Sequence, residues 1–191
     1  MSNYYAVLSR MKSIYRWGLM RNVRQESLSE HSLEVALVAH ALALIGNKKF
    51  GKNYDCEHIA VCAMLHDTSE IITGDMPTPI KYYNDEIKTA YKKIEAVASN
   101  ELIHLLPDYL QDDFLPLYNM TDEEEKIVKA ADKLSALIKC IEEINMGNRE
   151  FISAKESIQR AICNLNSPEA DVFLKDFIPP FECTLDQQTK I

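Results

Sequence analysis

A histidine and two carboxylates occur close together in the segment HDTSE, where His66 and Asp67 are adjacent and Glu70 follows one turn later. The segment ends an apolar run, IAVCAML, that has the pattern of a buried helix. With about 3.6 residues per turn, His66 and Glu70 continue the inward stripe of that helix. A buried carboxylate costs several kcal/mol unless it is paired or bound to metal. The segment therefore predicts a divalent cation site, or, for His66 alone, a core histidine hydrogen-bonded to a carbonyl.

A second histidine and a third acid lie on other predicted helices. On the preceding helix an inward stripe consists of His31, Val35, Val38, Leu42 and Ile45. Asp132 lies in KAADKLSALIKC, whose small residues permit close helix approach. Periodicity puts Asp132 at the edge of its stripe, so by itself it is more typical of a surface acid. Imidazole and carboxylate together suit Mn, Fe, Co, Ni or Zn, and carboxylate oxygens also suit Mg.

Helix signals cover most of the chain, and strands are hard to place. Capping residues and Gly or Pro stops predict long helices from Ser27 to about Leu44, ended by Gly46, from Asp55 to about Ile72, ended by Gly74, from Glu86 to Leu106, and from Thr121 to Asn145. Shorter helices are predicted from Asn148 to about Asn164 and from Ser167 onward, with a loop at Pro77 and Pro79. The expected fold is all-α, a compact irregular helical bundle in one domain over residues 1–191, with its core at about 4–180 and a short C-terminal tail.

Charge and composition restrict the partners. The net charge of −8 argues against a nucleic acid polymer or an anionic membrane as partner. Basic residues nevertheless gather before the first acid, Glu26, as either a solvated face or a receptor for a small anion such as phosphate: Arg10, Lys12, Arg16, Arg21 and Arg24. No signal-peptide pattern is present, and the longest apolar stretch carries Glu34 and His40, so we expect a cytoplasmic protein.

The ordered set His31, His66-Asp67 and Asp132 resembles the HD-domain metal-dependent phosphohydrolases. The segments RWGLMRNVRQESLSEHSLEVA, HDTSEIITGDMPTP and KAADKLSALIKC are similar to those of the bacterial 5′-deoxynucleotidases within that superfamily. The similarity extends from the N-terminal helix to about Pro180. It implies an HD-type helical domain with one divalent metal held by these four residues, Co or Mn or another transition metal, with Mg and Zn also compatible.

The resemblance also implies roles for other residues. Glu70 would orient or deprotonate a water that the metal acidifies, and Arg16 would grip the substrate phosphate. Trp17 would form one wall of the pocket for the sugar or base. Without the resemblance, the only tryptophan of the chain is expected to pack in the core. Asp75 would hold the ribose or protonate the leaving O5′, in a substrate loop that continues through Met76, Pro77 and Thr78. Without the resemblance, that loop is a helix stop followed by a proline-rigid turn. His31, Asp67 and Asp132 would also face the substrate.

The function implied is hydrolysis of deoxyribonucleoside 5′-monophosphates to deoxynucleoside and phosphate, by a homodimer. Two alternatives stay open at this point. One is another HD phosphohydrolase, of the guanosine tetraphosphate or nucleotide phosphodiesterase type, although Ile71 stands where the tetraphosphate hydrolases have a further acid and the GYP signature of cyclic-dinucleotide phosphodiesterases is absent. The other is a non-catalytic nucleotide sensor in which the metal only stabilises the fold.

Overall fold

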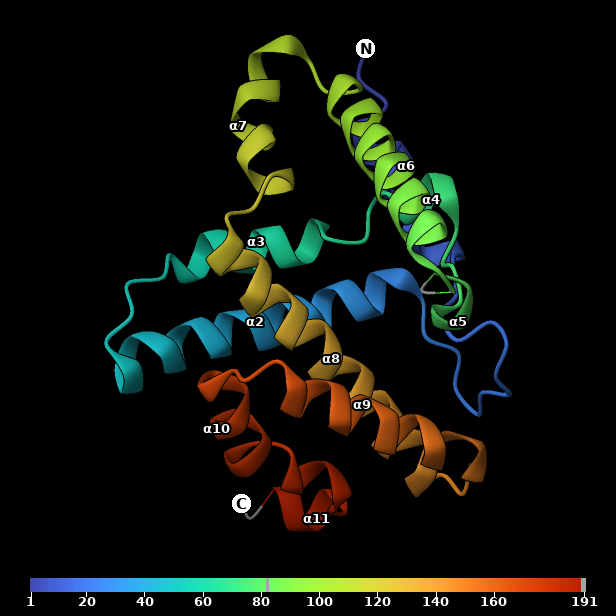
Figure 1. Cartoon of the computed structure of the whole chain (residues 1–191), viewed down its shortest axis with the longest axis vertical. Helices are drawn as coiled ribbons and strands as arrows, with labels where there is room; N and C mark the ends of the chain where they lie inside the picture. The colour runs from blue at the N-terminus through green and yellow to red at the C-terminus, as the bar shows by residue number, and fades with distance from the viewer. Residues whose placement is uncertain (82, 190–191) are drawn as a thin grey trace.

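The computed structural model describes residues 1–81 and 83–189, except for the side chain of Thr78, and within this part the chain contains helices but no β-strand. Figure 1 shows α2 and α8 crossing at the centre, with α6 and α7 on one side and α10 and α11 on the other. The all-α prediction is confirmed. In chain order the elements are α1 (Tyr4–Leu8), η1 (Ser9–Ser13), α2 (Leu28–Phe50), α3 (Cys56–Leu65), α4 (Glu70–Thr73), α5 (Thr78–Lys81), α6 (Asp85–His104), α7 (Asp108–Tyr118), α8 (Asp122–Asn145), η2 (Arg149–Phe151), α9 (Ile152–Asn164), α10 (Pro168–Asp176), η3 (Pro179–Glu182) and α11 (Leu185–Gln188).

The main core lies where α2, α3 and α8 pack together, with α9 and α10 covering α8 and α2. Val35 and Leu42 of α2 and Leu134 of α8 are fully buried there. α2 is long and apolar enough to span a membrane, but half of its apolar window is buried inside the protein, as expected of a core helix. The cytoplasmic location stays a prediction.

A smaller apolar cluster joins α1 to α6 and α7, around Tyr4, Leu102 and Leu106. The Tyr4 hydroxyl is 2.7 Å from that of Tyr118, which in turn lies 3.3 Å from the Thr68 hydroxyl oxygen. Because Thr68 lies in the turn after α3, this second cluster supports the segment that carries His66, Asp67 and Glu70. Of these elements, α7 was not predicted from the sequence.

Two predicted helix ends are wrong. α2 passes through Gly46 and ends at Phe50, with Gly51 in the left-handed conformation at φ 64°. Gly46 is required for close approach, since a Cβ there would lie 2.6 Å from the Tyr54 ring. The predicted helix from Asp55 to Ile72 ends at Leu65. Thr68 donates from both its backbone and its hydroxyl to the Leu65 carbonyl, at 3.1 and 2.7 Å, and these bonds tighten the chain into turns before α4 begins at Glu70.

The remaining helix predictions are close to the structure. Both predicted capping boxes form, with Ser27 and Thr121 as the N-caps of α2 and α8. The region around Pro77 and Pro79 is not all loop, because a short helix, α5, starts at Thr78. This is compatible with proline, which fits the first turn of a helix. The division of the chain into a single domain stays a prediction.

A buried ion pair on α8 holds the loop that precedes α2. Lys139 and Glu143 lie one turn apart, 2.6 Å from Nζ to Oε1, with side chains 4% and 0% exposed. Glu143 also accepts the backbone N–H groups of Val23 and Arg24, at 2.9 and 3.0 Å, and the Asn148 amide at 2.7 Å. Burial opposes ionisation of Glu143, but these donors outweigh it and lower its pKa to about 2. The carboxylate therefore ties the 14–27 loop to the helix that carries Asp132.

We expect Glu143→Ala to lower the free energy of unfolding by about 3–5 kcal/mol, because it leaves the Lys139 charge buried without a countercharge. Chemical denaturation of the full chain measures this. Glu125→Ala is the matched control, since Glu125 and Lys129 form a pair of the same spacing on the same helix with both side chains exposed. Loss of that pair should cost under about 1 kcal/mol. Equal losses in the two variants would contradict the role given to Glu143.

Candidate metal centre and active site

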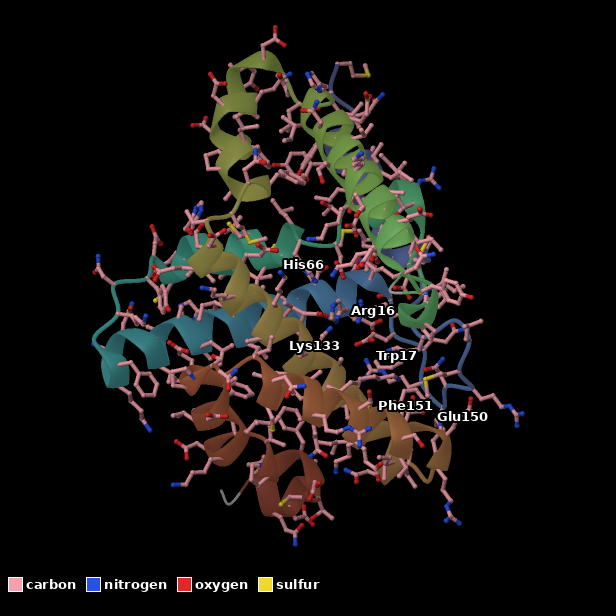
Figure 2. The ribbon with its side chains drawn as sticks, in the orientation of Figure 1. Arg16, Trp17, His66, Lys133, Glu150 and Phe151 are labelled. Carbon is pink, nitrogen blue, oxygen red and sulfur yellow. The ribbon has the colours of Figure 1, made fainter. Side chains whose placement is uncertain are left out.

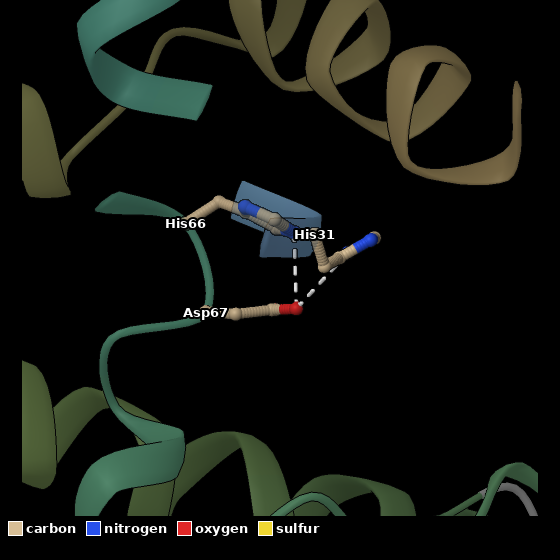
Figure 3. A group of neighbouring side chains, drawn as sticks. All are labelled: His31, His66 and Asp67. Atoms are coloured by element: carbon tan, nitrogen blue, oxygen red, sulfur yellow. Dashed lines mark ion pairs between the residues drawn. The ribbon is translucent and has the colours of Figure 1, made fainter. Parts of the chain in front are cut away.

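Two histidines and an aspartate meet where the start of α2 faces the end of α3. His31 lies in the first turns of α2, His66 is the C-cap of α3, and Asp67 follows it. Asp67 Oδ2 is 3.5 Å from His31 Nε2 and 3.1 Å from His66 Nε2. One potential ligand atom from each of the three residues lies within 4.8 Å of the others, and Figure 3 shows both imidazoles directed at the carboxylate. The predicted inward position of His31 is confirmed, since its side chain is fully buried.

The free ring nitrogens of this cluster fit a cation. The Nε2 atoms of His31 and His66 are buried and have no hydrogen-bond partner. Their Nδ1 atoms are occupied on the other side of each ring, by the Ser135 hydroxyl at 3.1 Å and the Ala63 carbonyl at 2.7 Å. Buried polar atoms are almost always satisfied. Two orphaned imidazole nitrogens beside a carboxylate are therefore suited to a divalent metal ion.

Asp132 joins the cluster from α8. Its Oδ1 is 3.3 Å from His31 Nε2, and its Oδ2 is 2.9 Å from Lys133 Nζ. The side chain is 24% exposed, so the interpretation of Asp132 as a simple surface acid is wrong. The four predicted ligands thus converge from three separate parts of the chain.

Electrostatics favour buried positive charge here. Burial opposes ionisation of Asp67, but the nearby His66 and His31 outweigh it and hold the pKa of Asp67 well below its usual value. The pKa of Asp132 is likewise low despite burial, because His31 and Lys133 lie beside it. Burial by itself would lower the pKa of His66, yet Asp67 raises it to about 9. Both acids therefore stay ionised, and a divalent cation has the sign of charge that they require.

Arg16 spans the cluster. Its NH1 is 3.3 Å from Asp67 Oδ2, its NH2 is 3.8 Å from Asp132 Oδ1, and its Nε is 3.3 Å from Glu26 Oε2. An isolated bridge between Tyr15 and Ser27 closes the loop that carries Arg16 against the start of α2. Of the basic N-terminal residues, Arg16 faces the site, whereas Arg21 pairs with Glu150 and Arg24 with Glu30 at the surface.

Trp17 is held in an unusual backbone conformation, with φ at 61°. This left-handed region is unfavourable for a bulky residue and requires support from its surroundings. The indole N–H donates to Glu26 at 2.8 Å, and the ring lies 5.3 Å from Phe151 between centroids (Figure 2). Glu26 thus anchors both Arg16 and Trp17, and Trp17 is not the central core residue that its type alone suggests.

Glu70 lies in the first turn of α4 and is 4% exposed, with Oε2 buried and unpartnered. Burial first, and then the charges of Asp67 and Asp75, raise its pKa to about 9. Lys81 Nζ is 3.9 Å from Glu70 Oε1 and 2.8 Å from Glu95 Oε1. Although the chain leaves helical geometry between His66 and Glu70, the turns still direct Glu70 to the same cavity.

A cavity of about 660 Å³ opens beside the cluster. Burial raises the pKa of Asp75, which borders it. The side chain of Thr78 lies outside the described residues. Predicted site residues on its wall are Arg16, Trp17, Asp67, Glu70, Asp75, Met76, Pro77 and Asp132. Lys81, Lys133 and residues of α9, among them Ala154, Ser157 and Ile158, also line it.

Comparison with known proteins identifies the family. The family model described as 5′-deoxynucleotidase YfbR-like matches residues 3–181. The chain belongs to this family. A 5′-deoxynucleotidase of Vibrio vulnificus (strain YJ016) is 52% identical over 189 residues, 97% of each chain, and one of Yersinia pestis (strain Pestoides F) is 53% identical over 190 residues, 98% of this chain and 96% of the relative. As a YfbR-like 5′-deoxynucleotidase, the chain is a hydrolase, and the predicted family and enzyme class are confirmed.

Solved structures agree with the fold of the YfbR-like family. An HD-domain phosphohydrolase of Listeria innocua superposes with a TM-score of 0.80 at 25% identity, covering 94% of this chain and 88% of the other. The HD phosphohydrolase of cyanophage S-2L gives 0.70 at 20% identity, with 94% and 96% covered. HD phosphohydrolases bind divalent metal, and the His/Asp cluster that suits one is present in this chain.

Sequence reasoning missed several residues of this YfbR-like site. In the sequence, Glu26 was noted only as the first acid after the basic segment. Its contacts with Arg16 and Trp17 form because the loop closes against the start of α2, and no sequence motif indicates that closure. Lys133 directly follows Asp132, and Lys81 comes three residues after Thr78. Lys81 was recognised as a polar residue near the substrate loop but was not assigned to the site. The small residues of α9 carry no signal of their own.

We expect Asp67→Ala to abolish metal retention, because it removes the carboxylate that lies next to both imidazoles. At a metal concentration about a hundred times Kd, binding should stabilise the unaltered chain by about 2.7 kcal/mol, or roughly 5–10 °C in Tm. Thermal melts with Mn²⁺ or Co²⁺ measure the shift. Asp176→Ala should keep the shift, because Asp176 lies on α10 and pairs with Lys49 at the end of α2 far from His31. A full metal-induced shift in Asp67→Ala would refute the ligand assignment.

Proposed function

We propose that this YfbR-like protein hydrolyses 2′-deoxyribonucleoside 5′-monophosphates to deoxynucleoside and phosphate, with one divalent cation held by His31, His66, Asp67 and Asp132. The observation that carries the proposal is the pair of buried, unpartnered Nε2 atoms of His31 and His66 beside Asp67, which itself lines a cavity together with Arg16. Co and Mn are the proposed metals, with Mg and Zn compatible. The cyanophage relative is described with dA and one catalytic Zn²⁺, which supports the same classes of ligand here.

When bound, a divalent cation acidifies a coordinated water and screens phosphate charge. Arg16 lies over both Asp67 and Asp132, so a phosphate placed at the cluster also meets its guanidinium. That group can hold two phosphate oxygens at once and stabilise the charge that develops on them in phosphoryl transfer. Lys133, 2.9 Å from Asp132, adds a second cation at the cavity wall.

Glu70 and Asp75 are the proposed proton carriers. Glu70 accepts the proton of the attacking water, and its carboxyl ionises near neutral pH only with positive charge beside it, because burial and two acids raise its pKa to about 9. Asp75 borders the same cavity with a raised pKa, which suits the acid that protonates the leaving O5′ or a group that holds the ribose. The two acids thus differ in role.

Trp17 is the proposed wall beside the sugar or base, and the loop of Met76, Pro77 and Thr78 is proposed as the rest of the substrate site. Glu26 and Phe151 hold the indole in a strained backbone conformation, so its position is fixed before substrate arrives. A rigid apolar wall without a hydrogen-bond partner for a 2′-hydroxyl discriminates by about a hundredfold or less. We further propose a cytoplasmic homodimer.

A phosphate-release panel tests the function. We expect release from deoxyribonucleoside 5′-monophosphates with Mn²⁺ or Co²⁺, slower release from ribonucleotides, and none from 3′-monophosphates or guanosine tetraphosphate. Equal turnover of AMP and dAMP would remove the deoxy assignment. Hydrolysis of guanosine tetraphosphate alone would favour the other HD phosphohydrolase type. If no substrate released phosphate, the result would favour the non-catalytic nucleotide sensor whose metal only stabilises the fold.

We expect Glu70→Gln to keep metal and lose roughly 10²- to 10⁴-fold in kcat, since a positioned general base contributes about that factor. Rates with dAMP, together with the metal-induced rise in Tm, separate the two effects. Glu101→Gln, an exposed carboxylate on α6, should leave both unchanged and serves as the control. Full activity in Glu70→Gln would show that the base assignment is wrong.

A further inference from the structure

A hydroxyl and a carboxylate lie behind His31, on the side away from Asp67. Ser135 Oγ is 3.1 Å from His31 Nδ1 and 2.6 Å from Glu34 Oε2. Ser135 is fully buried on α8, three residues after Asp132, and Glu34 lies on α2, three residues after His31. The same two helices that supply metal ligands therefore also supply this pair.

The hydroxyl has one proton, so its two contacts constrain each other. A separation of 2.6 Å is typical of an O–H group that donates to a carboxylate. When Ser135 donates to Glu34, its oxygen is left to accept from His31 Nδ1–H. A neutral His31 ring then has its proton on Nδ1 and none on Nε2, the atom that lies 3.5 Å from Asp67 and 3.3 Å from Asp132.

When the His66 ring is neutral, as metal binding requires, its tautomer is fixed by a different route. Its Nδ1 lies 2.7 Å from the Ala63 carbonyl, which can only accept, so Nδ1 must carry the proton and no further residue is required. A serine hydroxyl by contrast can either donate to or accept from Nδ1. Only the carboxylate beyond it decides the direction, which makes Glu34 necessary for His31 in a way that has no counterpart for His66.

We propose that Glu34, through Ser135, is a positioning residue that fixes His31 in the Nδ1–H tautomer with Nε2 free for metal. The proposal rests on the metal site of the proposed function. Glu34 borders a separate cavity of about 160 Å³, whose wall shares no residue with the substrate cavity. Its effect is therefore on the metal ligand and not on substrate contact. Outer-shell partners of ligating histidines typically change metal affinity about 10- to 100-fold.

Chelator competition with Zn²⁺ as the probe, on the full chain, tests the proposal together with ¹⁵N NMR of the histidine rings in metal-free protein. Ser135→Ala and Glu34→Leu should weaken Zn²⁺ binding about 10- to 100-fold and shift the His31 ring signals toward the Nε2–H tautomer or a mixture. Glu34→Gln keeps an acceptor oxygen and should lose less than Glu34→Leu. The ring signals of His66 should stay unchanged in all three variants, which a general loss of structure would not allow.

Ser32→Ala is the matched control, because Ser32 is a buried hydroxyl next to His31 that makes no hydrogen bond. It should bind Zn²⁺ like the unaltered chain. Unchanged Zn²⁺ affinity and unchanged His31 signals in both Ser135→Ala and Glu34→Leu would overturn the proposal. Glu34 is partly exposed, so Glu34→Leu keeps the test decisive if Ser135→Ala does not fold. Failure of the unaltered chain to bind Zn²⁺ or hydrolyse dAMP would count against the proposed function, while the His31 signals in metal-free protein still report the tautomer.

Discussion

The rest of the structure depends on placing two carboxylates and two imidazoles together in a largely buried position. Such a cluster is unfavourable unless each polar atom meets a partner or a cation. Its members come from α2, the end of α3 and α8, so these elements must approach closely. Fully buried alanines on both long helices, Ala39 of α2 and Ala131 of α8 among them, permit that approach. The apolar core therefore serves to bring charged ligands within reach of one another.

The loop before α2 depends on the same two helices. Glu26 holds Arg16 and Trp17 from within the loop, and the buried Lys139–Glu143 pair holds the loop backbone from α8. Since α8 also carries Asp132, one helix fixes both a proposed metal ligand and the loop that faces it. The left-handed φ of Trp17 is compatible with this arrangement, because a strained residue persists where its surroundings over-determine it.

Local patterns predicted much of this arrangement. The stripe through His31 and the capping boxes at Ser27 and Thr121 depend on neighbours a few residues away, and they appear in the structure as expected. Predictions that depended on distant contacts were less successful. Gly46 has the type of a helix stop, but the Tyr54 ring packed against it decides its role. Asp132 lies at the edge of its stripe, and only the approach of α2 turns it toward His31.

The turn after α3 shows why the site was predicted better than the helix that carries it. The argument for Glu70 assumed a continuous helix, and Thr68 interrupts that helix by bonding back to Leu65. Glu70 nevertheless faces the cavity, because the turns that replace the helix are also tight, with Glu70 N–H bonded to the Asp67 carbonyl at 3.0 Å. A spacing of three or four residues keeps side chains on one side in either geometry. Residue spacing thus constrained the chemistry even where the predicted element was wrong, whereas the hydrogen bonds behind each ligand, such as those of Ser135, required the packed structure.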